Sequence, residues 1–227
     1  IVLKPRKEGG PFVLQVANKD SAILVQDILI GDVWLCSGQS NMDFRLKEAK
    51  TGKEELKDKP FNPNIRLLKY AGAAPTNKEP WDAATLEKVD QYQFYNGIWQ
   101  TVDETSAADF SAVGYYFGKK IAFETGVPVG LIQVALGGSP TESWIERKVL
   151  EKNPQLKGIV NDWEHTPLVM DWCRERASEN IGKSNSKIHP FQPGYNFKAG
   201  IEPLTTFPIK GVIWYQGESN LMFEDAR

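Results

Sequence analysis

Two apolar segments that each end in a small polar turn constrain the fold of this chain more than any other feature. The first is GDVWLCSGQSNM at residues 31–42, and the second is GVIWYQGESN at residues 211–220. Each has the pattern of a buried strand that runs into a glycine-containing turn. Ligands of open α/β sheets bind outside the carboxyl ends of the strands. These two turns are therefore the first candidates for a functional site.

Between the two segments, strand and helix patterns alternate. Further strands are predicted at 65–70 and 129–135, and helices from residue 40 or 41 towards 50, over 111–125, over 141–150 and within 155–180. In the helix at 111–125, Val113, Phe117 and Ile121 lie four residues apart and are expected to form its buried face. Gly126 is expected to end that helix. The alternation predicts βαβ units and a parallel sheet.

Residues 1–30 have a different pattern. Apolar runs at 12–16 and 22–25, separated by polar residues, predict a β-hairpin. Two strands alone are marginally stable in water and need more sheet to cover them. We therefore predict two units: residues 1–30 as the remnant of an N-terminal β-sandwich-like domain, and residues 31–227 as an α/β domain.

Two long segments have the composition of surface structure. Residues 71–105 are rich in Trp, Pro, Asn and Gly and are predicted to be a surface excursion. Four of its aromatic side chains are expected to form a satellite core: Trp81, Tyr92, Tyr95 and Trp99. A sugar-stacking platform is the alternative. Residues 182–195 form a predicted polar loop that carries His189. We expect these two segments to decide which substrate a pocket at the strand ends accepts.

The charge balance excludes some classes of partner. The 227 residues include 27 basic and 29 acidic side chains, which gives a formal net charge of −2. This balance provides no long-range field for nucleic acid or for an acidic membrane surface, so neither is expected as a partner. The two histidines and two cysteines lack zinc-type spacing, and no phosphate-binding glycine motif follows a strand. We expect neither a metal nor a cofactor.

The strand ends supply the parts of a serine hydrolase. Ser40 follows the first strand, where the free N–H groups of a helix start favour negative charge. A serine nucleophile also needs a base and donors for the developing oxyanion. Gly137 and Gly138 leave backbone N–H groups unshielded, and Gln216 and Asn220 offer carboxamide donors. Each part has a structural alternative (a helix cap, a tight turn, satisfied loop amides), but their coincidence at three strand ends favours catalysis.

Three blocks of the sequence together resemble one enzyme family. GDVWLCSGQSNM, GVPVGLIQVALGGSPTESWI and GVIWYQGESN, in this order, resemble the sialate O-acetylesterase (SASA-type) branch of the SGNH hydrolase superfamily. The resemblance implies a three-layer α/β fold with a flavodoxin-like parallel sheet. It also implies the removal of acetyl groups from sugar hydroxyls, typically the 9-O-acetyl group of sialic acid. Acetylxylan and other acetylated glycans are alternative substrates.

The resemblance assigns roles to positions of this chain. Ser40 is expected to be the nucleophile, and its own N–H, a glycine N–H at Gly138 (or 137) and an amide of Gln216 or Asn220 are expected to form the oxyanion hole. Gln216 is favoured over Asn220 because it lies closer to the strand end. We further predict contacts with the sugar for three residues: Gln39, Glu218 and His189.

The acid–base residue of the family is not evident after the third block. SGNH enzymes carry their base in an Asp-x-x-His motif near the C-terminus of the catalytic domain. We expect this motif to lie outside residues 1–227, in a further segment or on a separate fragment chain, and the 227 residues alone to hydrolyse acetyl esters poorly. His189 is the alternative base within the chain, whereas His165 is expected to be a solvent-facing or capping residue.

Two rival functions remain open at this point. Glu142 and Glu218 both follow strand ends and could serve as the paired carboxylates of a glycosidase, although Ser40 and the amides would then have no role. A non-catalytic carbohydrate-binding fragment is the other alternative, supported by 7 tryptophans and 7 tyrosines. By family resemblance, the protein is expected to be secreted, periplasmic or lysosomal.

Overall fold

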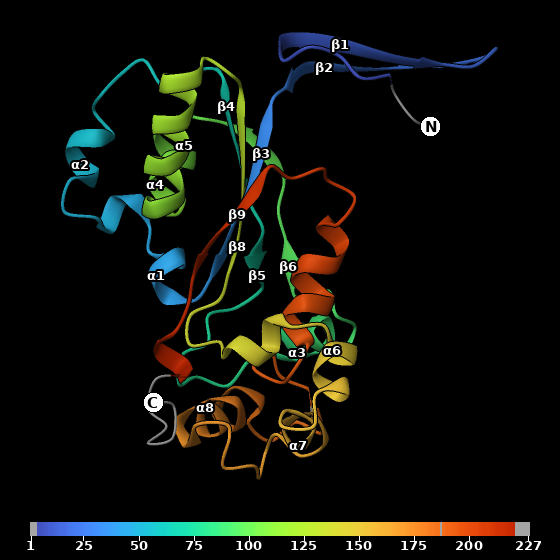
Figure 1. Ribbon diagram of the computed structural model, residues 1–227, viewed down its shortest axis with the longest axis vertical. Helices are drawn as coiled ribbons and strands as arrows, with labels where there is room; N and C mark the ends of the chain where they lie inside the picture. The colour runs from blue at the N-terminus through green and yellow to red at the C-terminus, as the bar shows by residue number, and fades with distance from the viewer. Residues whose placement is uncertain (1–3, 187, 221–227) are drawn as a thin grey trace.

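A five-stranded sheet forms the centre of the molecule. The computed structural model describes residues 4–186 and 188–220, and its central strands lie in the order β7-β4-β8-β3-β9 (Figure 1). The strands are β3 (Asp32–Gly38), β4 (Ile65–Lys69), β7 (Trp99–Thr101), β8 (Val129–Ala135) and β9 (Gly211–Tyr215). Four of them run parallel, and β7 pairs antiparallel with β4 at the edge. The predicted α/β class with a parallel sheet is confirmed in this form.

The position of β3 brings three polar turns together. This strand lies between β8 and β9, with Gly38 opposite Ala135 on one side and opposite Tyr215 on the other. Parallel strands end at the same edge of a sheet. The turns that follow β3, β8 and β9 are therefore neighbours in space, although they lie far apart in the sequence.

Helices cover both faces of the sheet (Figure 1). One face carries α1 (Ser40–Asp43), α2 (Gly52–Glu55), α4 (Glu104–Asp109) and α5 (Ala112–Thr125), and the other carries α3 (Ala83–Asp90), α6 (Arg147–Lys152), α7 (Lys157–Asn161) and α8 (Asp171–Ile181). Side chains alternate along the strands, so Cys36 and Leu131 face the first group while Leu35 and Ile132 face the second. No helix in the described part of the chain is both long and apolar enough to cross a membrane.

Shorter elements complete the connections. Strands β5 (Ala71–Gly72) and β6 (Tyr95–Asn96) form a small separate sheet. Single helical turns occur as η1 (Leu46–Glu48), η2 (Thr141–Trp144), η4 (Glu202–Leu204) and η5 (Glu218–Asn220), with a π-helical turn η3 (Phe197–Ile201). The predicted helix over 141–150 is thus divided into η2 and α6, and the helical region within 155–180 into α7 and α8.

The N-terminal hairpin is confirmed. Strands β1 (Gly9–Ala17) and β2 (Ala22–Ile30) pair antiparallel and project away from the central sheet (Figure 1). Val13 and Ile23 are 61% and 66% exposed, so the apolar faces of the hairpin are uncovered within the described residues. The division of the chain into a β-domain remnant over 1–30 and an α/β domain from residue 31 stays a prediction.

The helix predicted from Ser40 towards residue 50 is wrong beyond Asp43. The backbone of Phe44 is extended, with ψ of 116°, and its carbonyl accepts a hydrogen bond from Ala112 N (2.8 Å). Leu46 N in turn donates to Phe110 O (2.9 Å). Pairing with the segment before α5 therefore replaces the helical hydrogen bonds, and α1 is a single turn directly after β3.

Helix α5 begins and ends as predicted, but its buried face differs. Gly126 ends the helix in the left-handed conformation, with φ of 68°. Val113, expected in the core, is 36% exposed, whereas Gly118 packs on the sheet. A Cβ at Gly118 would lie 2.5 Å from Leu131 Cδ1. The helix thus approaches β8 through small residues, which a search for large apolar side chains does not detect.

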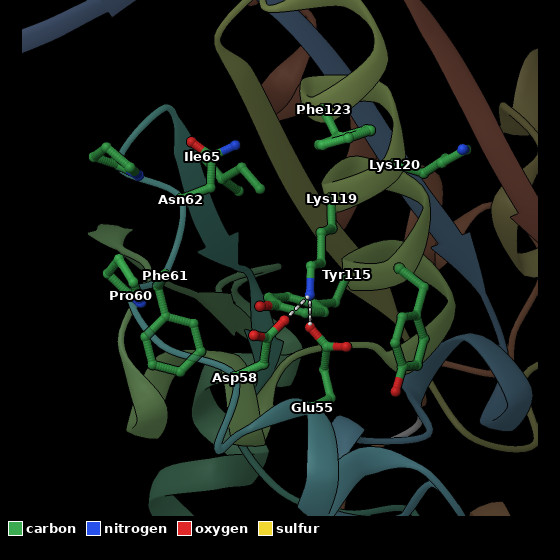
Figure 2. Close-up of a pocket in the computed structure, with 12 residues that line it drawn as sticks. Glu55, Asp58, Pro60, Phe61, Asn62, Ile65, Tyr115, Lys119, Lys120 and Phe123 are labelled. Atoms are coloured by element: carbon green, nitrogen blue, oxygen red, sulfur yellow. Dashed lines mark hydrogen bonds and ion pairs between the residues drawn. The ribbon is translucent and has the colours of Figure 1, made fainter.

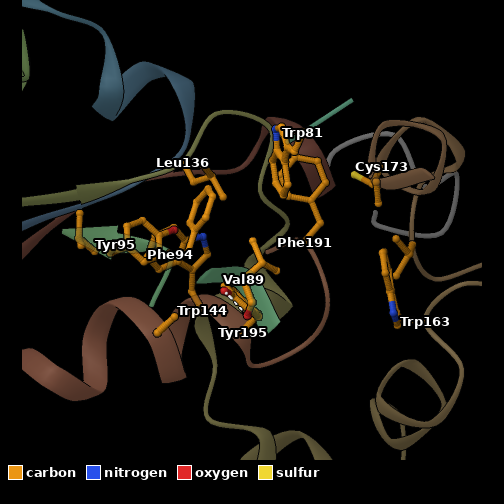
Figure 3. Packing of buried hydrophobic residues seen from close by; sticks show 14 of the residues in the cluster. Trp81, Val89, Phe94, Tyr95, Leu136, Trp144, Trp163, Cys173, Phe191 and Tyr195 are labelled. Carbon is orange, nitrogen blue, oxygen red and sulfur yellow. Dashed lines mark hydrogen bonds between the residues drawn. The ribbon is translucent and has the colours of Figure 1, made fainter. Parts of the chain in front are cut away.

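The segment 71–105 is more than a surface excursion. It contains α3 and contributes β7 to the central sheet. Trp81, Phe94 and Tyr95 are buried in one aromatic cluster, which also includes Trp144 and Tyr195 (Figure 3). The expectation that aromatic residues of this segment form core is confirmed for Trp81 and Tyr95, but it is wrong for Tyr92 and Trp99, which are 38% and 37% exposed. The same cluster includes Leu68 of β4 and Ile132 of β8, so it packs against the central sheet.

His189 belongs to the same cluster. Its ring stacks on Trp81 with centroids 4.9 Å apart, and its side chain is 0% exposed. Nδ1 accepts a hydrogen bond from Phe191 N (3.1 Å), and Nε2 lies 3.2 Å from Asn180 Oδ1. Burial, with a smaller contribution from the charge of Arg176, lowers the pKa of His189 to about 3. The ring is therefore neutral at physiological pH.

This buried histidine makes the protein sensitive to acid. Above pH 6.5 His189 is neutral in both the folded and the unfolded chain, but between pH 6.5 and 3 only the unfolded chain binds the proton. The free energy of unfolding should then fall by about 1.4 kcal/mol per pH unit on this account alone. Urea unfolding at pH 7 and at pH 5 gives the acid loss, which is the decrease in the free energy of unfolding between the two pH values. This acid loss should be smaller in His189→Gln than in the wild type. The matched variant His165→Gln should show no reduction of the acid loss, because Asp162 raises the pKa of His165 and protonation of this residue favours the folded state. An unchanged loss in His189→Gln would contradict the prediction.

Candidate functional site

Ser40 is exposed at the carboxyl end of β3, as the first residue of α1. Two residues earlier, Gly38 has φ of 145°, and a Cβ there would lie 2.0 Å from Tyr215 O. Only glycine permits this approach of β3 to β9. The sequence Gly38-Gln39-Ser40 therefore turns sharply and leaves the Ser40 side chain at the open edge of the sheet.

Gln39 faces inward and joins two of the turns. It is 3% exposed, its N–H donates to Tyr215 O (3.0 Å), and its Oε1 accepts from Ser219 N (3.2 Å). A side chain in this position orients the turn after β9 relative to Ser40. This nearly buried position gives no support to the sugar contact predicted from the sequence.

The turn after β8 lies directly beside Ser40. A Cβ built on Gly137 would be 3.9 Å from Ser40 Cβ. Leu136 N donates to Gly38 O (3.1 Å), which fixes this turn to the end of β3. Within residues 4–186 and 188–220, the backbone N–H groups of Ser40 and Gly138 have no hydrogen-bond acceptor. Unpaired N–H groups next to a serine hydroxyl are the donors that an oxyanion requires.

The amides of the third turn are already engaged. Gln216 Nε2 donates to Asn220 Oδ1 (2.7 Å) and, over 3.4 Å, to Ser139 O. Asn220 Nδ2 faces both carboxylate oxygens of Glu142 (3.1 and 3.2 Å). Thr141 N–H donates to Asn220 Oδ1 (3.0 Å), and the Thr141 hydroxyl lies within hydrogen-bond distance of both Gln216 Oε1 and Asn220 Oδ1. The amides thus tie the second turn to the third, and each would have to exchange an acceptor to reach an oxyanion.

The two glutamates proposed for a glycosidase are likewise bound to amides. Glu218, at the start of η5, accepts a hydrogen bond from Asn41 Nδ2. Glu142 is held by Asn220, as described above. Asn41 directly follows Ser40, so Glu218 lies close to the helix start that carries the serine. Its predicted contact with a sugar stays a prediction.

Neither histidine forms a hydrogen bond to Ser40 within the part of the chain that the structure describes. The buried position of His189 gives no support to its predicted roles in substrate contact or as a base. His165 faces solvent, as expected. The expectation that residues 1–227 contain no Asp-x-x-His motif is wrong, because Asp162 and His165 have this spacing. His165 Nδ1 and Asp162 Oδ1 lie 2.6 Å apart, and this hydrogen bond raises the pKa of the imidazole. The pair is solvent-exposed in the connection between α7 and α8.

A cavity of about 580 Å³ adjoins the second turn at the carboxyl ends of β4 and β8. Its wall includes Gly137, the carboxylate of Asp43 and the side chain of Gln133, whose Nε2 donates to Asp43 Oδ1 (2.9 Å). Burial raises the pKa of Asp43, while the nearby charges of Lys69 and Arg45 oppose the increase. Three cationic side chains line the cavity with this one carboxylate: Arg45, Lys69 and Arg176.

A second cavity, of about 540 Å³, lies between α2 and α5 (Figure 2). Lys119 of α5 forms ion pairs there with Glu55 of α2 and with Asp58 (2.9 Å for the latter). Ile65, the first residue of β4, also lines this cavity. The cavity therefore lies near the amino ends of the parallel strands, whereas Ser40 lies at their carboxyl ends. None of the site residues predicted from the sequence lines this cavity.

Sequence reasoning missed several residues that hold the site. Thr141 and Asp43 join the turns or line the cavity, but neither follows a strand directly. The available signal was their nearness in the sequence: Asp43 lies shortly after Ser40, and Thr141 lies shortly after Gly138. Within the described residues, no group of three or more His, Cys, Asp or Glu side chains is arranged to hold a metal ion.

Comparison with known proteins agrees with this geometry. Residues 30–165 match the family model described as carbohydrate esterase, sialic acid-specific acetylesterase. The sialate O-acetylesterase of Rattus norvegicus is 29% identical over 97% of this chain and 42% of its own length. The human sialate O-acetylesterase is 31% identical over 98% of this chain and 38% of its own length.

A solved structure shares the fold. A carbohydrate acetylesterase from Xanthomonas citri superimposes with a TM-score of 0.63 at 29% sequence identity, over 96% of this chain and 39% of that protein. The chain thus spans about two fifths of the length of the relatives it matches. The family model covers more than half of the chain, and it includes Ser40 and the turn at Gly137 and Gly138. The chain belongs to the carbohydrate esterase family of sialic acid-specific acetylesterases.

Proposed function

We propose that this chain carries the reaction centre of a carbohydrate O-acetylesterase in which Ser40 is the nucleophile. The observation that carries the proposal is the exposed Ser40 side chain beside Gly137, with unpaired N–H groups at Ser40 and Gly138. Ser40 Oγ attacks the acetyl carbonyl carbon, the sugar hydroxyl departs, and water then releases acetate from the acetyl-serine. The two N–H groups stabilise the negative charge on the carbonyl oxygen in both steps.

Gln216 is the side chain best able to add a third donor. Its contact with Ser139 O is long, at 3.4 Å, so one amide hydrogen can turn towards the oxyanion at little cost. Asn220 instead faces a carboxylate, and a charge-assisted hydrogen bond is stronger than a neutral one. We therefore keep Gln216 as the preferred donor of the third turn and Asn220 as the residue that positions it.

The general base is proposed to come from an Asp-x-x-His segment outside the described residues, as the family resemblance implies. The pair formed by Asp162 and His165 is the alternative within this chain. His165 is exposed and its ring contacts Asp162, while no hydrogen bond joins it to Ser40 in the described part of the chain. This position favours the external segment.

The cavity beside Gly137 supports an acidic sugar as substrate. Of the three cations that line it, Arg45 and Arg176 also form ion pairs with neighbouring carboxylates, whereas Lys69 forms no ion pair within the described residues. A sugar that carries a carboxylate would gain more from this cationic lining than a neutral one. A 9-O-acetylated sialic acid fits this chemistry better than acetylxylan. The curated relatives are named for sialate esters, which agrees with this choice.

Two further proposals follow from the family. The parallel strands lie in the spatial order β4-β8-β3-β9, which is second, third, first and fourth along the chain and differs from the second-first-third start of a flavodoxin-like sheet. Support for a layered arrangement comes instead from the helices on both faces of the sheet and from the family resemblance. We propose a three-layer SGNH arrangement with this variant strand order and with β7 added at the β4 edge. We also propose a secreted, periplasmic or lysosomal location, by resemblance alone.

Substitution of the nucleophile tests the function directly. Ser40→Ala, in the natural polypeptide that carries this chain, should reduce acetate release from 9-O-acetylated sialic acid by at least about a thousandfold, because the attacking oxygen is lost. Ser178→Ala, an exposed serine of α8, is the matched control and should retain the wild-type rate. Acetylxylan measured in parallel should be cleaved more slowly. Full activity of Ser40→Ala would refute the proposal, and faster cleavage of acetylxylan would reverse the substrate assignment.

The source of the base can be tested separately. His165→Gln should change acetate release by less than about threefold if the base lies on another segment, because loss of a general base costs about 10²–10⁴ in rate. The pH dependence of kcat should also be unaffected. A loss in the 10²–10⁴ range, with the acidic limb of the pH profile removed, would assign the base to His165 instead.

A further inference from the structure

We propose that Thr76 is a positioning residue that orients the backbone N–H of Gly138 for catalysis. The inference rests on the proposed function, in which this N–H group stabilises the oxyanion. Thr76 lies in the loop after β5, about sixty residues before the turn it acts on. Its hydroxyl donates a hydrogen bond to Gly137 O at 2.7 Å.

The geometry of the peptide bond transmits this contact to the donor. The carbonyl of Gly137 and the N–H of Gly138 belong to one planar trans peptide, so they point in opposite directions. A hydrogen bond that fixes the direction of Gly137 O therefore fixes the direction of Gly138 N–H as well. The N–H has no acceptor of its own within the described residues, so it contributes no competing restraint.

Two consecutive glycines make such a restraint necessary. Glycine adopts positive and negative φ almost equally, and Gly138 has φ of 78°. Without a partner for Gly137 O, the peptide between the glycines could rotate and turn its N–H away from Ser40. The peptide that follows Gly138 is held separately, because Ser219 Oγ donates a hydrogen bond to Gly138 O (3.1 Å). Thr76 therefore restrains the peptide before Gly138, and Ser219 restrains the peptide after it.

The loop that carries Thr76 is itself anchored. Three successive carbonyl oxygens of this loop accept hydrogen bonds from side chains elsewhere: Pro75 O from Trp81 Nε1 (3.0 Å), Thr76 O from Arg176 Nη1, and Asn77 O from Asn180 Nδ2 (2.5 Å). Arg176 and Asn180 lie one turn apart on α8. The position of the Thr76 hydroxyl is therefore set by α8 and by the aromatic core.

The contact also lies where substrate would bind. Thr76 and Gly137 both line the cavity of about 580 Å³ proposed to hold the sugar. Valine has nearly the shape of threonine but no hydroxyl, so Thr76→Val preserves the cavity wall while it releases the peptide. Substrate binding should then be little changed, whereas stabilisation of the transition state should be weakened.

The experiment measures kcat and KM for acetate release by the natural polypeptide that carries this chain. Thr76→Val and Thr76→Ala should each lower kcat about 10- to 100-fold with KM within about twofold of the wild type. Thr76→Ser, which keeps the hydroxyl, should restore kcat to within about threefold of the wild type. Thr205→Val is the matched control, because Thr205 Oγ1 donates to Glu202 O over the same 2.7 Å in a different part of the fold.

A second readout does not depend on turnover. The amide resonance of Gly138 in a ¹⁵N–¹H spectrum should move in Thr76→Val and Thr76→Ala and stay in place in Thr76→Ser and Thr205→Val. Wild-type kcat in either hydroxyl-free variant, a rise in KM alone, or an unmoved Gly138 resonance would overturn the role of Thr76. Absence of acetate release from the wild type would instead refute the proposed function, and the amide resonance would still decide the orientation.

Discussion

The proposed site depends on the pairing of β3 with β8 and β9. This pairing places the carboxyl ends of three strands side by side. At the end of β3, the close approach of Gly38 to Tyr215 of β9 requires glycine, because any Cβ there would collide with Tyr215 O. Ser40, Gly138 and Gln216 are brought together by this register. A shift of one residue would turn every side chain of β3 to the opposite face and remove Ser40 from the edge.

Polar contacts then link the three turns into one unit. Gln39 holds the turn after β9, Ser219 holds the carbonyl of Gly138, and Thr141 holds Asn220. Most of these bonds are made by buried or half-buried groups, where an unpaired polar atom is costly. The result is a preorganised set of backbone donors around an exposed hydroxyl, which is the arrangement that lowers the barrier of acyl transfer most effectively.

The predictable parts of the fold and of the site were those with a local signal. The strand at 129–135 and the helix after Ser111 follow from apolar runs and from the cap and stop residues that surround them. The end of α1 at Asp43 and the glycine face of α5 depend on contacts with distant segments, which no local pattern records. For the same reason Ser40 was evident as a candidate from its turn, whereas the burial of His189 and the contact of Thr76 became visible only in three dimensions.

Covalent labelling tests the central claim most directly. An organophosphonate that reacts with activated serines is incubated with the natural polypeptide that carries this chain, and the modified residue is mapped by peptide mass spectrometry. The account predicts loss of acetate release together with a single phosphonyl group on Ser40. Loss of acetate release with the phosphonyl group on any other residue would contradict it.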